Sequence, residues 1–243
     1  METGASGSHG ASPAPVVFHC SLCGSALLEE EQLQTCVYCG AEEECEWLCP
    51  EGHYVCEDCR AASAEELIGR TALATREADP VAIADLIMKH PLFRAHGPAH
   101  HLLVAPVILA ALRNQGYPVK ESGIHTALHR TKDIPVAVCG TRGDCGAAAG
   151  LGCAVSMLTG ATFRSDGERS QALRATARAL DRVAELGGPR CCRQSVYGTL
   201  EAAVPFLKSE LGLTLAIPSP IRCPFSHTTE ECKQERCVYF SED

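Results

Sequence analysis

Cysteine spacing constrains the N-terminal part of this chain more than any other feature of the sequence. Eight of the sixteen cysteines lie between residues 20 and 59, and the first four form two Cys-x-x-Cys-Gly knuckles. In a knuckle the turn brings both sulfurs to one side of a hairpin tip, and the glycine accepts the positive φ that lets backbone amides face the thiolates. The knuckles predict a zinc ribbon with the ligands Cys20, Cys23, Cys36 and Cys39.

A second set of ligands follows the knuckles. Its spacing predicts another tetrahedral zinc site, formed by Cys49, His53, Cys56 and Cys59. In one alternative Cys45 replaces His53 as a ligand, and in another the first knuckle shares an ion with this second set in a cross-braced arrangement. Four thiolates also suit iron, as in rubredoxin. A closed site does no chemistry, so this block is expected to be a scaffold or docking module.

The metal interpretation assumes a reducing compartment. The first nine residues lack the basic and apolar regions of a signal peptide, and no run approaches the ~18 apolar residues of a membrane span. We therefore expect a cytoplasmic protein without membrane contact, in which thiols bind metal rather than form disulfides. The formal net charge of −9 disfavours general nucleic-acid binding, because phosphate binding requires a basic surface.

The rest of the chain is predicted to be helical. Aromatic residues make up only 5% of the sequence, which favours close-packed helices over aromatic-rich strands. Ser63 and Glu66 form a capping box, and Asp79 precedes Pro80 as an N-cap, so helices should start at both places. Further helices are expected at 102–112, 121–131, 168–186 and 194–211.

The predicted fold class is mainly α, with an N-terminal zinc-ribbon-like metal block followed by a compact all-helical, cysteine-rich domain. Residues 1–15 are rich in glycine, serine, alanine and proline, which predicts a disordered tail. The zinc-binding ribbon would occupy 16–61 and the helical domain 62–222. Residues 223–243 would form a C-terminal cysteine metal loop packed on the helical domain.

A stretch of small residues lies at 139–160. It contains three cysteines, and its glycines at 146, 150 and 152 would let neighbouring backbones approach the helix closely. Cys145 and Cys139 are predicted to face a site. Cys153, about two turns beyond Cys145, is expected to pack as a small apolar residue.

Three histidines precede the apolar helix at 102–112, namely His96, His100 and His101. The macrodipole at a helix N-terminus disfavours the imidazolium form, which leaves a neutral imidazole that can bind a metal or accept a proton. His100 and His101 are therefore candidate proton-transfer residues. In the alternative, these side chains only hydrogen-bond loop carbonyls and cap the helix.

Two adjacent cysteines, Cys191 and Cys192, lie between Arg190 and Arg193 near the start of the last long helix. The arginines and the helix N-terminus favour the thiolate. Adjacent side chains point in different directions on a helix, so one cysteine should face a site. Cys191 is predicted as the reactive thiol and Cys192 as a metal ligand. The two arginines would receive the anionic group of a small substrate.

The C-terminal cysteines, Cys223, Cys232 and Cys237, are spaced C-x8-C-x4-C and include a Cys-Pro step. Without a tight knuckle, this spacing favours a [4Fe-4S] cluster over a third zinc, which remains the alternative. The fourth iron would take Cys192, or otherwise Cys191, Cys139 or a substrate. With four thiolates the cluster can transfer electrons or support the structure, whereas an open iron can act as a Lewis acid.

Several motifs together resemble an uncharacterised, conserved family of cysteine-rich proteins from anaerobic prokaryotes, sometimes appended to methyltransferase domains. They are Cys49-Pro-Glu-Gly-His-Tyr-Val-Cys-Glu-Asp-Cys59, His96-Gly-Pro-Ala-His-His101, Gly143-Asp-Cys-Gly146, Leu186-Gly-Gly-Pro-Arg-Cys-Cys192 and Cys223-Pro-Phe-Ser226. The run from Cys145 to Ala154 is also similar to the helix of iron-sulfur-dependent serine dehydratases and cysteine desulfidases. That similarity implies an open-iron cluster that eliminates water or hydrogen sulfide.

Two functions fit these observations. In the first, an iron-sulfur-dependent lyase or sulfur-handling enzyme acts on a small anionic or sulfur-containing substrate. Thiolates would come from Cys145, Cys139 or Cys191, and His100 or His101 would move protons. In the second, a non-catalytic accessory or regulatory metalloprotein docks a partner, such as a methyltransferase, through its zinc ribbon and senses or delivers metal or sulfur. The absence of a Walker, dinucleotide or nucleophile-elbow motif favours the second.

Overall fold

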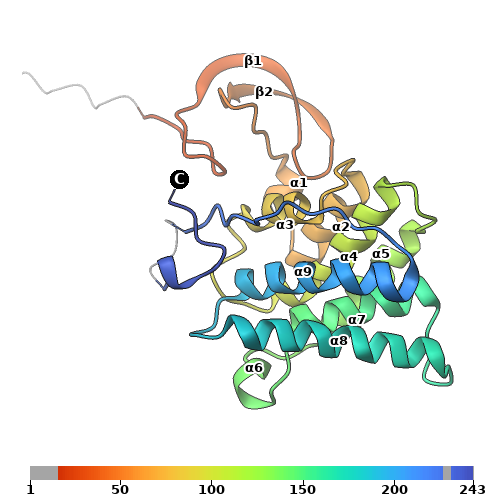
Figure 1. The fold of residues 1–243 in the computed structure, drawn as a ribbon. Helices are drawn as coiled ribbons and strands as arrows, with labels where there is room; N and C mark the ends of the chain where they lie inside the picture. Colours follow the sequence, from red (N-terminus) through yellow and green to blue (C-terminus); the bar gives the residue numbers. More distant parts are fainter. Residues whose placement is uncertain (1–15, 227–230, 243) are drawn as a thin grey trace, which may run out of the picture.

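The computed structural model describes residues 16–226 and 231–242, so the tail predicted at 1–15 lies outside the described residues. The described chain is mostly helical, as expected, with nine α-helices, one two-stranded sheet and a short 3-10 turn. Figure 1 shows the sheet and its connections standing off one end of a helical body. No helix among the described residues is long and apolar enough to cross a membrane.

The sheet is an antiparallel hairpin of β1 (Leu28–Thr35) and β2 (Glu42–Leu48). The second cysteine knuckle forms its turn. Gly40 has a φ of 74°, and Gly24 in the first knuckle has the same value, so both glycines adopt the predicted left-handed conformation. After β2 the chain passes through Cys49 and His53 and enters the single-turn helix α1 (Glu57–Arg60). Ligand-bearing turns therefore lie at both ends of this hairpin.

The helical body begins where its capping residues predict. Ser63 and Glu66 form the capping box of the first long helix, and Asp79 accepts a hydrogen bond from the backbone N–H of Val81 with Pro80 in the first turn. The helices that follow α1 are α2 (Ala64–Ala74), α3 (Pro80–Met88), α4 (Ala99–Asn114), α5 (Glu121–Thr131), α6 (Val138–Thr141), α7 (Gly146–Thr159), α8 (Gly167–Leu186) and α9 (Cys192–Leu211).

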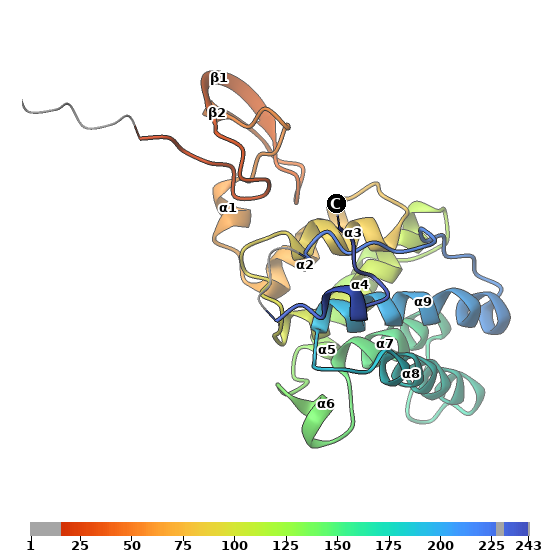
Figure 2. The same cartoon turned by 60° about the vertical axis from the view of Figure 1, so that its left-hand side comes forward.

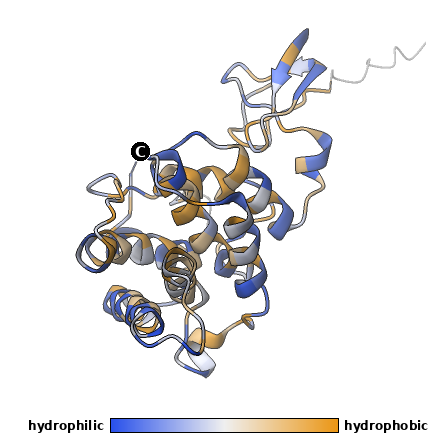
Figure 3. Ribbon diagram, turned by 90° about the vertical axis from the view of Figure 1, so that its right-hand side faces the viewer, coloured by the Kyte–Doolittle hydropathy of each residue, from blue (hydrophilic) through white to orange (hydrophobic). Residues whose placement is uncertain are grey.

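Helix α4 is the centre of this body. Every residue from Leu102 to Leu112 is buried, because α2, α3, α5, α7 and α9 all pack against it. A helix that is apolar all round needs such cover on every side. Figure 3 shows the hydrophobic residues gathered on the inner helices, while hydrophilic residues cover the hairpin and the outer helices.

Small residues let α7 pack closely between α4 and α8. A Cβ added to Gly150 would lie 2.8 Å from Cβ of Val104, and one added to Gly152 would lie 2.0 Å from Oγ1 of Thr176. Glycine in a helix costs about 1 kcal/mol relative to alanine. The close contacts explain why the helix carries these glycines, as the sequence predicts.

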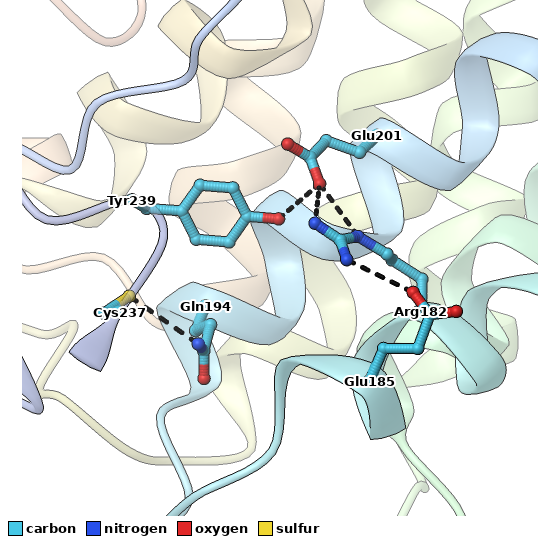
Figure 4. Close-up of polar contacts among 6 residues, drawn as sticks. All are labelled: Arg182, Glu185, Gln194, Glu201, Cys237 and Tyr239. Atoms are coloured by element: carbon cyan, nitrogen blue, oxygen red, sulfur yellow. Dashed lines mark hydrogen bonds and ion pairs between the residues drawn. The ribbon is translucent and has the colours of Figure 1, made fainter.

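The C-terminal segment runs back along α9, as the two views in Figures 1 and 2 show. Figure 4 shows one anchor of this segment: the hydroxyl of Tyr239 donates a 2.6 Å hydrogen bond to Glu201 on α9, and Arg182 on α8 donates to the same carboxylate at 2.8 and 3.0 Å. The buried Lys233 provides a second anchor, since its Nζ donates to the carbonyls of Leu186 and Gly187. These contacts hold the C-terminal cysteines near the start of α9.

Candidate metal centres and the adjoining pocket

The first group of candidate metal ligands joins the first knuckle to the segment after β2. It consists of Cys20, Cys23, Cys49 and His53, whose ligand atoms lie within 4.8 Å of one another. The sulfurs of Cys23 and Cys49 are 3.6 Å apart, and Nδ1 of His53 lies 3.8 Å from the sulfur of Cys49. Two sulfurs bound tetrahedrally to one ion at ~2.3 Å lie ~3.8 Å apart. The group can therefore hold a single tetrahedral ion.

The second group joins the hairpin turn to α1. It consists of Cys36, Cys39, Cys56 and Cys59, again with all ligand atoms within 4.8 Å of one another. The sulfurs of Cys39 and Cys56 lie 3.6 Å apart. Three of the four side chains are buried, and they continue into the hydrophobic core of the helical body. An ion at this place would fasten the hairpin to the body.

The two groups are interleaved along the chain, so the ligand pairing predicted for a ribbon is corrected. Cys20 and Cys23 share a group with Cys49 and His53, not with the second knuckle. This is the cross-braced alternative. Cys45 belongs to neither group; its thiol faces the carbonyls of Gln32 and Trp47 on the hairpin. The predicted ligand residues remain the same eight, but their partners differ.

The thiols of these groups differ in acidity. The pKa of Cys23 is lowered to about 6, chiefly by the side-chain hydrogen bond with Ser25. Burial raises the pKa of Cys56 to about 11, and burial also raises that of Cys59. Metal binding requires thiolates, so an ion entering the second group must displace protons. Binding there should weaken at low pH.

A separate cluster of cysteines lies where the C-terminal segment meets α9. The cysteines that line this small cavity are Cys191, Cys223, Cys232 and Cys237. The sequence predicted Cys192 as the fourth cysteine of this set, but the fourth cysteine of the cavity is Cys191. Cys191 is the N-cap of α9 and has an extended backbone, whereas Cys192 is the first helical residue. Cys191 lines both this cavity and the larger one beside it, whereas Cys192 lines only the larger one.

Two polar side chains accompany this cluster. Nε2 of Gln194 donates a 3.6 Å hydrogen bond to the sulfur of Cys237 (Figure 4). The buried guanidinium of Arg193 lies over the ring of Phe225 and close enough to Cys223 and Cys191 for their charges to act on its pKa, which burial lowers. Arg193 therefore lies beside the thiols and not in the predicted substrate pocket. Sequence reasoning missed Gln194, since nothing in its local sequence distinguishes it.

A larger pocket of about 370 Å³ adjoins the small cavity that these four cysteines line. The pocket and the small cavity share Cys191 and Gln194. The larger pocket brings together all the predicted catalytic residues, namely His100, His101, Cys139, Cys145 and Cys191. Arg190, predicted to bind the substrate, and Cys192, predicted as a cluster ligand, also line its wall. These residues come from α4, α6 and the starts of α7 and α9. Cys153 lies outside it, packed with a pKa that burial raises to about 11, and His96 lines the smaller cavity beside Glu231.

The two pocket histidines each bind a backbone carbonyl through Nδ1. The Nδ1 atom of His100 lies 3.3 Å from the carbonyl of Gly97, and that of His101 lies 3.2 Å from the carbonyl of Ile134. Each Nδ1 therefore carries the proton and leaves the lone pair on Nε2. Burial lowers the pKa of His100 to about 4 and also lowers that of His101. Both can accept a proton or bind a metal.

The thiols of the pocket lie in different environments. Cys139 is exposed on the short helix α6, whereas Cys145 is buried as the N-cap of α7. Burial raises the pKa of Cys192, and the nearby positive charge of Arg190 opposes that rise.

Comparison with known proteins finds one family. A model described as a family of unknown function, DUF5714, matches residues 68–240. The match begins within α2 and ends at Phe240 in the C-terminal segment, so it leaves out both metal groups of the hairpin region. No curated protein and no solved structure matches the chain.

Proposed function

The chain belongs to the family of unknown function DUF5714, and we propose that it is a zinc and iron-sulfur protein that carries out sulfur chemistry in the pocket beside the cluster. The observation that carries this proposal is the adjacency of two cavities at the start of α9. One is lined by four cysteines, and the other by two neutral imidazoles and further thiols. Cys191 and Cys192 are neighbours in the chain and face these cavities.

Two zinc ions would occupy the interleaved groups. One group offers three thiols and one imidazole, and the other offers four thiols. Both sets are typical of closed structural zinc sites, which contribute to folding and leave no open position for a substrate. The zinc ions would therefore support the hairpin region and take no part in the reaction.

An iron-sulfur cluster would occupy the smaller cavity. The four cysteines there do not form one of the tight groups found among the described residues. Four thiolates, one for each iron, are the ligand set that a [4Fe-4S] cluster takes. The Arg193 charge and the N–H···S hydrogen bond of Gln194 would stabilise the negative charge of the bound cluster.

In the larger pocket, the imidazoles would accept protons and the thiols would act as nucleophiles. His101 or His100 would take the proton of Cys145 or Cys192, and the resulting thiolate would attack one sulfur of a disulfide or persulfide substrate. The new S–S bond to the enzyme would form as the S–S bond of the substrate breaks, and the departing sulfur would leave as a thiol with the proton of the imidazolium. Arg190 would receive the anionic group of that substrate. When bound, a cluster with four thiolates would supply electron transfer. This ligand count favours sulfur handling over the lyase alternative, which requires an open iron.

Purification without oxygen tests this proposal. Iron, inorganic sulfide and zinc are measured, and EPR spectra are recorded after reduction. We expect iron and sulfide together with zinc, and a Cys232→Ser variant should lose the iron but keep the zinc. Cys139→Ser is the matched control, because Cys139 lines neither the cluster cavity nor the zinc groups. Zinc without iron or sulfide in the wild-type protein would contradict the cluster.

A second function is favoured by the extent of the family match. Because the match begins at residue 68, the two metal groups lie outside the family region. A separate metal-bearing hairpin suits an accessory protein that docks a partner, such as a methyltransferase, and delivers metal or sulfur. Deletion of residues 1–61 tests this alternative: partner binding would be lost while iron binding by the remaining body persists.

A further inference from the structure

Helix starts converge on the larger pocket. Helices α4, α7 and α9 all begin at its wall, and no side chain caps any of these three N-termini. A helix N-terminus carries partial positive charge and free N–H groups, so it attracts anions. At α7 the lining residues are Gly146 and Ala147 in the first turn.

A buried acceptor belongs to a residue that lines the same pocket. His100 is only 1% exposed, and its Nε2 has no hydrogen-bond partner among the described residues. Its Nδ1 donates a hydrogen bond to the carbonyl of Gly97. The unpartnered Nε2 therefore carries a lone pair and needs a hydrogen-bond donor. Buried polar groups without partners are rare because they cost free energy. Since His100 lines the pocket, a bound molecule is the available source of that donor.

Charged side chains at the pocket are arranged for an anion. Arg190 is exposed and has no ion pair within the described part of the chain. The carboxylate of Asp144, which also lies near α7, is already engaged: it accepts a 2.7 Å hydrogen bond from the backbone N–H of Cys145 and pairs with Arg142 at 3.9 Å. The free cation and the start of α7 therefore offer a site for a carboxylate.

We infer that the pocket binds a small carboxylate that also bears a hydrogen-bond donor, namely a thiol, hydroxyl or ammonium group. The carboxylate lies between Arg190 and the start of α7, and the donor satisfies Nε2 of His100. A volume of about 370 Å³ is suitable for such a molecule, since ligand pockets usually measure ~300–1,000 Å³. The inference gives a substrate class to the site of the proposed function, but binding itself does not require the cluster.

Glycolate and acetate test this inference by calorimetric titration of the full-length protein without oxygen. The two anions differ only in the hydroxyl group of glycolate. We expect glycolate to bind about tenfold more tightly, because only glycolate satisfies the buried acceptor. Arg190→Gln should weaken the binding of both anions about fivefold or more. His100→Phe should bind acetate as the wild type does and lose the preference for glycolate.

Further measurements distinguish a failure of this inference from a failure of the proposed iron-sulfur cluster. The Cys232→Ser protein should still prefer glycolate, because Cys232 does not line this pocket. A preference lost in that variant would place glycolate on the metal and overturn the inference, as would equal affinities for the two anions. If His100→Phe fails to fold, the Arg190→Gln variant tests the inference instead, because Arg190 is exposed. Unchanged binding of both anions by Arg190→Gln would overturn the inference. A wild-type protein without iron that prefers glycolate would refute the cluster alone.

Discussion

The ring of His101 occupies the space where a side chain at Gly146 would begin. A Cβ built on Gly146 would lie 2.2 Å from Cγ of His101, which is closer than two carbons can approach. The first residue of α7 is therefore glycine because the imidazole of α4 crosses directly over it. This contact fixes the position of the pocket histidine relative to Cys145.

Replacing Gly146 with alanine should displace His101 and destabilise the fold. Overpacking of this kind costs about 1–3 kcal/mol, which urea unfolding can measure. Gly140→Ala is the matched control, since Gly140 also lines the pocket but nothing lies within 4 Å of its added Cβ. The control should be neutral or slightly stabilising. Equal stabilities for the two variants would contradict the contact.

The adjacent cysteines at the start of α9 should differ in their effect on iron binding. Cys191→Ser removes a residue that lines the cluster cavity, whereas Cys192→Ser removes one that lines only the larger pocket. Iron content and the EPR signal should fall in the first variant and persist in the second. The reverse result would restore the assignment that the sequence suggested.

Zinc content should reveal the interleaved ligand groups. Cys49→Ser should lose one of the two ions, and Cys45→Ser should keep both, because Cys45 belongs to neither group. Limited proteolysis of the two variants gives a second measurement, since loss of an ion should expose the first knuckle to cleavage. Zinc lost from Cys45→Ser would show that the groups are assigned incorrectly.

Asp85 should make stability fall as the pH rises from about 4 to about 6. Burial raises its pKa to about 6, although Tyr197 donates a 2.5 Å hydrogen bond that opposes the rise. The folded protein then binds a proton more tightly than the unfolded chain does, and this stabilisation is lost as the carboxyl ionises. A shift of about 2 pKa units corresponds to about 2–3 kcal/mol.

Asp85→Asn isolates this contribution, because asparagine keeps an acceptor for Tyr197 and cannot ionise. The variant should be more stable than the wild type at pH 7, and the difference should shrink toward pH 4. His100, whose pKa is lowered, contributes the opposite slope in both proteins and cancels in the comparison. A difference that does not change with pH would contradict the buried carboxylate.

Short sequence motifs, each read from a few neighbouring residues, predicted much of this fold. The capping box at Ser63 and the Asp79–Pro80 start each fix a helix N-terminus through neighbouring residues, and each knuckle needs only its own glycine. The pairing of ligands was not determined by the sequence, since spacing within a knuckle does not specify which distant segment completes the site. Tertiary packing makes that choice.

The candidate pocket was predicted by residue type and not by geometry. Histidines, cysteines and Arg190 were identified from their positions at helix starts, and the structure brings them together. Cys191 was predicted in the reactive pocket and Cys192 at the cluster, whereas Cys191 lines both cavities and Cys192 lines only the larger one. The sequence does not show which of the two residues begins the helix; Cys191 is its N-cap.

The interleaved ligand order also affects how the protein is made. The first knuckle emerges from the ribosome well before Cys49 and His53, so neither metal group can be completed from the first forty residues. The first group is complete once His53 has been synthesised, and the second once Cys59 has followed. Both ions can then be captured almost together, before most of the helical body has been translated. Metal supply during synthesis would therefore decide whether that body later packs against a finished hairpin.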